Sequence, residues 1–331
     1  MARTTMKDVA QRAGVSTATV SHVINNSRYV GEETKSRVSK VIKELNYRPS
    51  AVARGLVTNN TCTIGIIISE QSNIFFSDVI QGVEEKFRPE NYGLMVCSTA
   101  EELLLEAHYF DLLLGQRVDG IIAAAISQYW SAISEAETRY TPIVFVDRLF
   151  DTLEGFFVGS KNKEGAYDGV KHLIERGHRK IGILSGFDRL STMRERYEGY
   201  SEALHDAGLE LNPDWVIPSQ LSVDGGRRSI QKLFSSNNRP TAIFVNNNLL
   251  SLGVLLEINK MGINCPDDLA IVGFDDHPWA AVSNPALTVV KQPAKKIGER
   301  AADILLSKIR KEPIEESQIL LDCELIVRES S

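Results

Sequence analysis

The chain has 331 residues, 43% of them hydrophobic, and a formal net charge of −6, enough for more than one domain with a substantial core. No apolar run approaches about 18 residues and the first residues are polar and basic, so we expect a cytoplasmic protein that is neither exported nor membrane-spanning. The four cysteines lack C-x-x-C spacing, which predicts reduced thiols and no metal site; no cofactor is expected either.

Residues 6–25 predict a helix-turn-helix. Gly14 permits the positive φ of a tight turn between the helices. Thr5 with Asp8 approximates a capping box for the first helix, and Ser16 is a suitable N-cap for the second. The small apolar residues that would join the helices are Val9, Ala10, Val20 and Val23.

The outer face of the second helix is the predicted DNA-reading surface. An ordinary solvated helical pair is the alternative, and charge disfavours it. Residues 1–60 carry ten Lys or Arg against four acidic residues, a net charge of +6, which leaves −12 for the remainder. The expected major-groove and phosphate contacts are Thr17, Ala18, Thr19, Ser21, His22, Asn25 and Arg28.

A third helix is predicted from Glu32 to Leu45, closing a three-helix headpiece over residues 1–49. Pro49 then breaks the chain, and residues 50–60 form a hinge whose short helix we expect to order only on DNA, in a dimer. The exposed apolar Leu56 is the predicted wedge into the minor groove.

The remaining residues alternate short apolar runs with helical patterns, which predicts an α/β fold of doubly wound parallel sheets. The number of runs favours two lobes with a ligand cleft between them. The runs that predict strands are Thr63–Ile68, Leu94–Cys97, Gly120–Ala124, Ile143–Val146, Ile181–Leu184, Ala242–Val245 and Ala270–Gly273.

Polar and aromatic residues follow the carboxyl ends of these strands, where ligands bind in open α/β sheets. Carboxylates, amides, guanidiniums and aromatic faces together suit a polyhydroxyl ligand. For each residue taken singly, a role in a turn or helix cap is the competing interpretation. The predicted effector-binding set is Asn73, Phe75, Phe76, Asp147, Arg148, Thr192, Arg196, Asn247, Asp275 and Trp279.

Residues 5–60 resemble the headpiece and hinge of the LacI/GalR family of bacterial transcription regulators, most closely its purine and ribose repressor branch. The similarity lies in Val15–Asn25 and in Tyr47–Leu56. It implies that Thr17, Ala18 and His22 read bases, that Ser21 and Asn25 hold phosphates, and that Leu56 wedges the central step of a palindrome. Val57 departs from the polar or basic residue that is common in that branch.

The resemblance extends over essentially the whole chain and implies a periplasmic-binding-protein-like core over residues 61–331. Its first lobe would span about 61–160 plus 291–321, and its second about 161–290 plus 322–331. Residues 287–293 are similar to the family's crossover into the first lobe. Arg196, Asn247 and Asp275 match the family's effector-binding positions.

Departures from the family pattern bear on the ligand. Purine-binding relatives carry an aromatic residue where this chain has Arg148 and an Arg where it has Leu190, which disfavours a purine. A neutral sugar or sugar derivative ranks first and an anionic sugar second, with Arg148 either meeting the anion or pairing with Asp147. Lys161 and Asn248 replace residues that are often Asp in relatives.

We therefore predict a homodimeric repressor that binds a pseudo-palindromic operator and responds to an effector in the cleft, with the sign of that response left open. No tetramerising tail is expected. An enzyme is disfavoured because no nucleophile elbow, P-loop, H-E-x-x-H or G-x-G-x-x-G motif is found. A transported-solute binding protein would need a signal peptide in place of residues 1–60.

Overall fold

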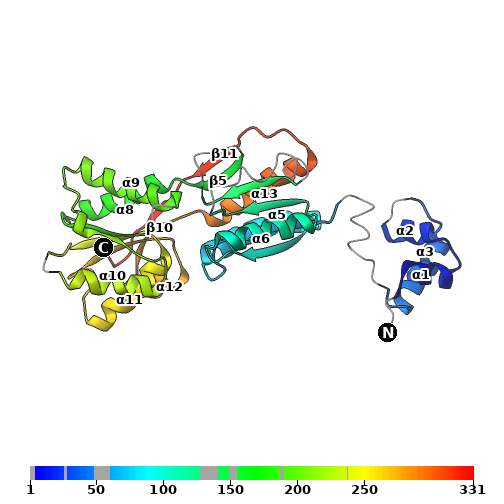
Figure 1. The fold of residues 1–331 in the computed structure, drawn as a ribbon, viewed down its shortest axis with the longest axis horizontal. Coiled ribbons are helices and arrows are strands. Elements are labelled where there is room, and N and C mark those ends of the chain that lie inside the picture. Colours follow the sequence, from blue (N-terminus) through cyan, green and yellow to red (C-terminus); the bar gives the residue numbers. More distant parts are fainter. Residues whose placement is uncertain are drawn as a thin grey trace. The chain divides into compact units, whose positions relative to one another are not determined.

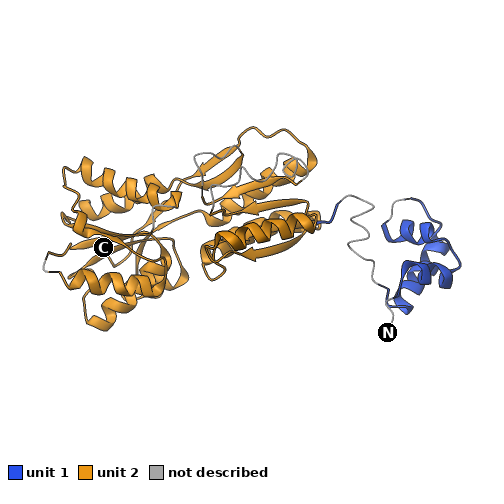
Figure 2. Ribbon diagram, viewed as in Figure 1, with its two compact units in different colours: residues 1–62 blue, residues 63–331 orange. Residues whose placement is uncertain are grey.

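The computed structural model describes residues 4–25, 28–47, 60–126, 141–148, 155–186, 190–236 and 238–331. The chain divides into two compact units, residues 1–62 and 63–331 (Figure 2). The predicted hinge helix and Leu56 lie outside the described residues.

The first unit is a three-helix headpiece of α1 (Met6–Ala13), α2 (Thr17–Asn25) and α3 (Glu32–Glu44). Both halves of the predicted capping box are present, between the side chain and backbone of Thr5 and those of Asp8. Gly14 ends α1 with φ of 65°, the left-handed conformation that a turn needs. The buried core of the headpiece consists of Val9, Ala10, Ala13, Val20, Val38 and Val41.

The second unit contains two six-stranded sheets, each with helices on both faces (Figure 1). The first sheet is parallel, in the order β11-β5-β4-β3-β1-β2. Its members are β1 (Thr63–Ile68), β2 (Gly93–Ser98), β3 (Gly120–Ala123), β4 (Ile143–Val146), β5 (Phe156–Ser160) and β11 (Gln318–Leu321).

The second sheet has the order β12-β10-β9-β8-β6-β7 and is parallel except for β12, which pairs antiparallel with β10. Its members are β6 (Ile181–Ser185), β7 (Val216–Pro218), β8 (Ala242–Val245), β9 (Ala270–Phe274), β10 (Thr288–Lys291) and β12 (Glu324–Ile326). The doubly wound α/β fold predicted from the sequence is confirmed, with the strands β5, β7, β10, β11 and β12 added to it.

Helices cover both faces of each sheet because both faces of the strands are apolar. On the first sheet, α5 (Ile74–Phe87) and α13 (Ala294–Arg310) share one core and α6 (Leu103–Gly115) packs on the opposite face. On the second, α8 (Asn162–Glu175) and α9 (Ser191–Asp206) cover one face, and α10 (Val223–Phe234) and α11 (Asn248–Met261) cover the other. The described residues of the unit also form three short elements, α12 (Pro278–Val282), η1 (Arg88–Glu90) and η3 (Pro213–Trp215).

The chain passes between the two lobes three times, after β5, after β10 and after β11. Each lobe is therefore built from separate stretches of sequence, and the crossovers run beside the carboxyl ends of the strands. Within the described ranges, no helix has the length and apolar character needed to cross a membrane.

Candidate functional site

The headpiece presents a polar face on α2. Ser16 caps this helix as predicted, since its Oγ accepts a hydrogen bond from the Thr19 backbone N–H at 3.1 Å and also contacts the Thr19 hydroxyl at 2.9 Å. The Thr19 side chain is thus engaged in the cap. Asn25 Nδ2 donates to Ser21 Oγ at 3.2 Å, which holds these two side chains together on the helix surface.

The predicted DNA-reading residues that the structure describes all reach the headpiece surface. Thr17, Ala18, Asn25 and Arg28 are exposed, and Thr19, Ser21 and His22 are partly exposed. Thr17, Ala18, Thr19 and Ser21 lie in the N-terminal half of α2, the part of a recognition helix that contacts base edges. Their contact with DNA stays a prediction.

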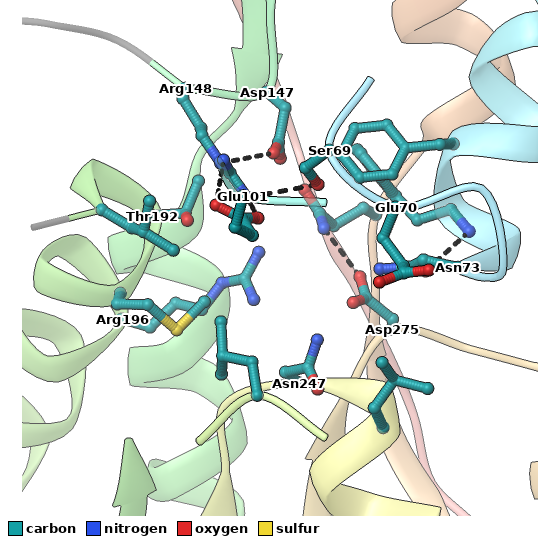
Figure 3. A pocket seen from close by; sticks show the side chains of 17 residues that line it. Ser69, Glu70, Asn73, Glu101, Asp147, Arg148, Thr192, Arg196, Asn247 and Asp275 are labelled. Atoms are coloured by element: carbon teal, nitrogen blue, oxygen red, sulfur yellow. Dashed lines mark hydrogen bonds and ion pairs between the residues drawn. The ribbon is translucent and has the colours of Figure 1, made fainter. Parts of the chain in front are cut away.

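A pocket lies beyond the carboxyl ends of the strands in the second unit, lined from both lobes (Figure 3). Nine of the ten predicted effector residues line it, and Trp279 does not. Trp279 sits on α12, packs against the second lobe's core and lies 5.6 Å from the His277 ring. Further lining residues are Ser69, Glu70, Glu101, Leu190, Met193, Leu221, Leu249 and Gln292.

Two aspartates occupy equivalent places in the two lobes. Asp147 follows β4 and Asp275 follows β9, and both have left-handed backbones, with φ of 69° and 74°. Each donates its backbone N–H to the neighbouring strand, to Val158 O at 3.1 Å and to Val290 O at 2.8 Å. Such conformations are uncommon for non-glycine residues and concentrate at ligand sites, where they aim a side chain.

Arg148 is held by Glu101. Its two terminal nitrogens donate to the two carboxylate oxygens at 2.6 and 3.1 Å, while its Nε lies 3.4 Å from Asp147 Oδ2. This bidentate guanidinium–carboxylate pair uses two of the five N–H donors of Arg148 and fixes the plane of its guanidinium. Burial raises the pKa of Asp147 to about 6, against the opposing charges of Arg148 and Arg196.

Arg196 is fixed by three contacts inside the second lobe. Its Nε donates to Asn162 Oδ1 at 2.9 Å and its Nη1 donates to the Asn246 carbonyl at 2.6 Å. The guanidinium carbon lies 3.6 Å from the centroid of the Phe274 ring. These contacts orient the remaining edge of the guanidinium toward the pocket (Figure 3).

A hydrogen-bonded chain of amides connects the lobes. Gln292 Nε2 donates to Asp275 Oδ1 at 2.6 Å, and Asn248 Nδ2 donates to Asn73 Oδ1 at 2.8 Å and more weakly to Asp275 Oδ2 at 3.4 Å. Asn73 is the N-cap of α5 in the first lobe, and Asn248 is the first residue of α11 in the second. The hydrogen bond between these asparagines therefore spans the cleft.

Two of the predicted effector-binding residues also cap helices, which was the competing interpretation of such residues. Asn73 Oδ1 accepts from the Phe75 N–H at 3.1 Å, and Asn247 Oδ1 accepts from the Leu250 N–H at 3.1 Å. Both residues also line the pocket, so capping fixes their orientation without removing them from the site.

Sequence reasoning missed Ser69, Glu70, Glu101 and Gln292. Ser69 and Glu70 come directly after β1, Glu101 follows β2, and Gln292 follows β10. The rule that ligands bind beyond strand ends applies to all four. Among the described residues, no group of three or more His, Cys, Asp or Glu side chains is arranged to hold a metal ion.

Comparison with known proteins agrees with this architecture. Residues 5–50 match the family of bacterial regulatory proteins of the lacI type, and residues 170–331 match the periplasmic binding protein-like domain. The chain is 36% identical over 327 residues to the HTH-type transcriptional repressor PurR of Aliivibrio salmonicida, covering 98% of both chains. It is likewise 36% identical to PurR of Pasteurella multocida over 328 residues, again 98% of both.

Solved structures give the same result. The lac repressor dimer bound to operator and the anti-inducer ONPF aligns with a TM-score of 0.88 at 26% identity, over 99% of both chains. The complex of the transcriptional regulator CelR with cellobiose aligns with a TM-score of 0.74 at 28% identity, over 99% of this chain and 100% of that one. The chain belongs to the LacI family of DNA-binding transcription regulators, and the resemblance stated from the sequence is confirmed.

Proposed function

We propose that this chain is a transcriptional repressor that binds a pseudo-palindromic operator as a homodimer and releases or holds it according to a small carbohydrate effector. The observation that carries the proposal is one pocket lined from both lobes, beyond the ends of two parallel sheets, in a chain with a helix-turn-helix headpiece. A ligand that contacts both lobes changes their relative orientation, and hinge segments transmit such a change.

The side chains of the pocket favour a sugar. Phe75 and Phe76 form an edge-to-face pair with centroids 5.1 Å apart, which offers flat apolar surface to sugar C–H groups. Carboxylates, an amide and a guanidinium around these rings suit hydroxyl groups. The structural relative solved with cellobiose supports the same class.

A purine is the second candidate, because relatives named PurR match the whole chain. The contacts of Arg148 weigh against it, since a bidentate ion pair with Glu101 occupies the position where an aromatic residue would be needed to stack on a base. Leu190, in turn, offers no hydrogen-bond donor to one.

Exposed leucines on α6 support a dimer. Leu103 and Leu104 are 50% and 86% exposed and Leu112 is 38% exposed, so a subunit contact here would bury apolar surface. We infer further that the chain works in the cytoplasm without a cofactor and regulates rather than catalyses. Sedimentation equilibrium of the full chain tests the dimer directly; a monomer at micromolar concentration contradicts it.

Two experiments test the function. Selection of duplexes from a random pool by the full chain is expected to enrich a pseudo-palindrome, and no enrichment would contradict operator binding. Thermal unfolding against sugars, sugar phosphates, acid sugars, purines and nucleosides is expected to show one stabilising class. A ligand at 100 times its Kd adds about 2.7 kcal/mol to the free energy of unfolding.

A further inference from the structure

The pocket has more negative than positive charge. Among its described lining residues are four carboxylates and two guanidiniums. Arg148 makes a bidentate pair with Glu101 and also lies 3.4 Å from Asp147 Oδ2, and the charge of Arg196 acts on the pKa of Asp147 too. Two carboxylates, those of Glu70 and Asp275, are then left over.

Both leftover carboxylates have only neutral partners among the described residues. Asp275 is 7% exposed and accepts hydrogen bonds from the amides of Gln292 and Asn248. Glu70 is exposed and accepts from the Ser72 hydroxyl at 2.9 Å. Figure 3 shows Glu70 and Asp275 on one side of the pocket, opposite Thr192 and Arg196.

Buried acceptors without donors lie beside Asp275. Gln292 Oε1 and Asn248 Oδ1 have no hydrogen-bond partner within the described part of the chain. Their orientation is set by Asp275, because each amide must turn its NH₂ group toward that carboxylate. Of these two residues Gln292 lines the pocket, so this side of the pocket combines negative charge with an unused acceptor, and Asn248 lies behind it.

The unpaired carboxylates of Glu70 and Asp275 favour a ligand group that is positively charged and also donates hydrogen bonds. A buried carboxylate without a counter-charge is costly, and a hydroxyl group supplies a donor but no charge. An ammonium group supplies three donors and a positive charge, whereas a phosphate or carboxylate group would be repelled.

We propose, on the basis of the proposed function above, that the effector is an amino sugar whose ammonium group binds between Glu70 and Asp275. Its ring lies against Phe75 and Phe76, and its hydroxyls meet Arg196 and Asn247 on the opposite side. The proposal assigns a positive charge to the carbohydrate effector. A cationic sugar therefore takes the place of the anionic sugar as the alternative to a neutral one.

Isothermal calorimetry on the full chain at pH 7 tests the proposal with matched sets. Each set contains glucosamine, galactosamine or mannosamine, its N-acetyl derivative and its parent sugar, with glucose 6-phosphate, which has a phosphate but no amine, added. In at least one configuration the free amine is expected to bind at least about tenfold more tightly than its N-acetyl and parent forms. Equal or tighter binding of a neutral form, or of the phosphate, overturns the amine but keeps a carbohydrate effector. Binding of purines alone, or of nothing, overturns the carbohydrate effector as well.

Variants locate the amine. Glu70→Gln changes an exposed residue and is expected to reduce the preference for the amine several-fold; Asp275→Asn is expected to remove it. Glu316→Gln, an exposed carboxylate outside this pocket, is the matched control and keeps the preference. A tenfold preference that survives in Asp275→Asn overturns the assigned position.

Discussion

Arg196 shows how one side chain joins the core to the ligand site. It is 3% exposed, bonded to Asn162 and to the Asn246 carbonyl, and stacked on Phe274. A lysine at this position cannot form both hydrogen bonds and stack with the same geometry. Arg196→Lys is therefore expected to lower the free energy of unfolding by about 1–3 kcal/mol, measured by urea denaturation, and to weaken effector binding.

The matched control is Arg228→Lys in the same lobe. Arg228 is exposed and makes one hydrogen bond, to Gln220 Oε1 at 3.0 Å. Its replacement is expected to change stability by less than about 0.5 kcal/mol. Equal effects of the two substitutions would show that the buried contacts of Arg196 carry no special weight.

Asp147 makes the free energy of unfolding depend on pH, and the sign of this dependence follows from the burial of its side chain. Burial raises its pKa from 3.8 to about 6, so between those values the folded state holds the proton more tightly than the unfolded chain. The contribution of this group to stability is then present at low pH and lost as the pH rises toward about 6. We expect Asp147→Asn to raise the free energy of unfolding of ligand-free protein by about 1–3 kcal/mol at pH 7 and to leave it unchanged near pH 4.

Urea denaturation of both proteins at pH 7 and pH 4 measures this difference. The difference between the two proteins reports Asp147 together with its effect on Glu195, whose pKa the charge of Asp147 helps to raise. A variant that is less stable than its parent at pH 7 would mean that the charges of Arg148 and Arg196 outweigh the burial of Asp147.

At the scale of elements, the position of a strand in its sheet explains part of what could be predicted. Six of the seven predicted strands lie inside the sheets, and the seventh, β2, is a partly exposed edge strand. Three missed strands, β7, β11 and β12, are edge strands, where polar residues weaken the apolar pattern, and β7 ends in Pro218. The other two missed strands, β5 and β10, are interior and largely buried, so edge position does not explain them.

Site residues could be predicted where the strand that precedes them was recognised. Asp147 and Asp275 were predictable because each follows a strongly apolar strand, whereas Gln292 follows β10, which was not recognised. Trp279 looked like a ligand because it follows Asp275 closely, but α12 turns it onto the second lobe's core. The ion pair of Arg148 with Glu101 joins residues 47 positions apart, and no local pattern predicts it.

Helices α5 and α13 approach each other through glycines. A Cβ atom at Gly298 would overlap the Val79 carbonyl, and one at Gly82 would overlap the Lys295 carbonyl. Because these obstacles are backbone atoms, the helices must move apart to admit a methyl group. Gly298→Ala is expected to lower the free energy of unfolding by about 2 kcal/mol or more, measured by chemical denaturation.

Gly115→Ala is the control for that substitution. Gly115 ends α6, has no atoms near its virtual Cβ and does not need a positive φ. Alanine there is expected to be neutral or to stabilise by up to about 1 kcal/mol. Similar losses at both positions would refute close helix packing as the cause.

At the scale of the whole molecule, charge is distributed differently over the headpiece and the remainder of the chain. The basic headpiece suits DNA, and the acidic remainder discourages contacts with DNA elsewhere. Within the second unit, three crossovers and the hydrogen bond between Asn73 and Asn248 connect the lobes. The crossovers are covalent, so the asparagine bond is a part of this connection that can open when the lobes move, as is the apolar contact of Ile126 with Leu190 and Met193.

Asn248→Ala tests that bond. Alanine cannot donate to Asn73, and it adds no charge beside Asp275, which Asn248 now approaches at 3.4 Å. The substitution therefore favours separation of the lobes and is expected to raise the effector concentration for half-maximal change in operator binding about tenfold. Fluorescence anisotropy of a labelled operator, titrated with the sugar that the calorimetry identifies, measures it. Asn238→Ala, exposed in the same lobe, is expected to leave the midpoint unchanged. An unchanged midpoint in Asn248→Ala as well would mean that the two lobes reach their ligand-bound arrangement without this hydrogen bond.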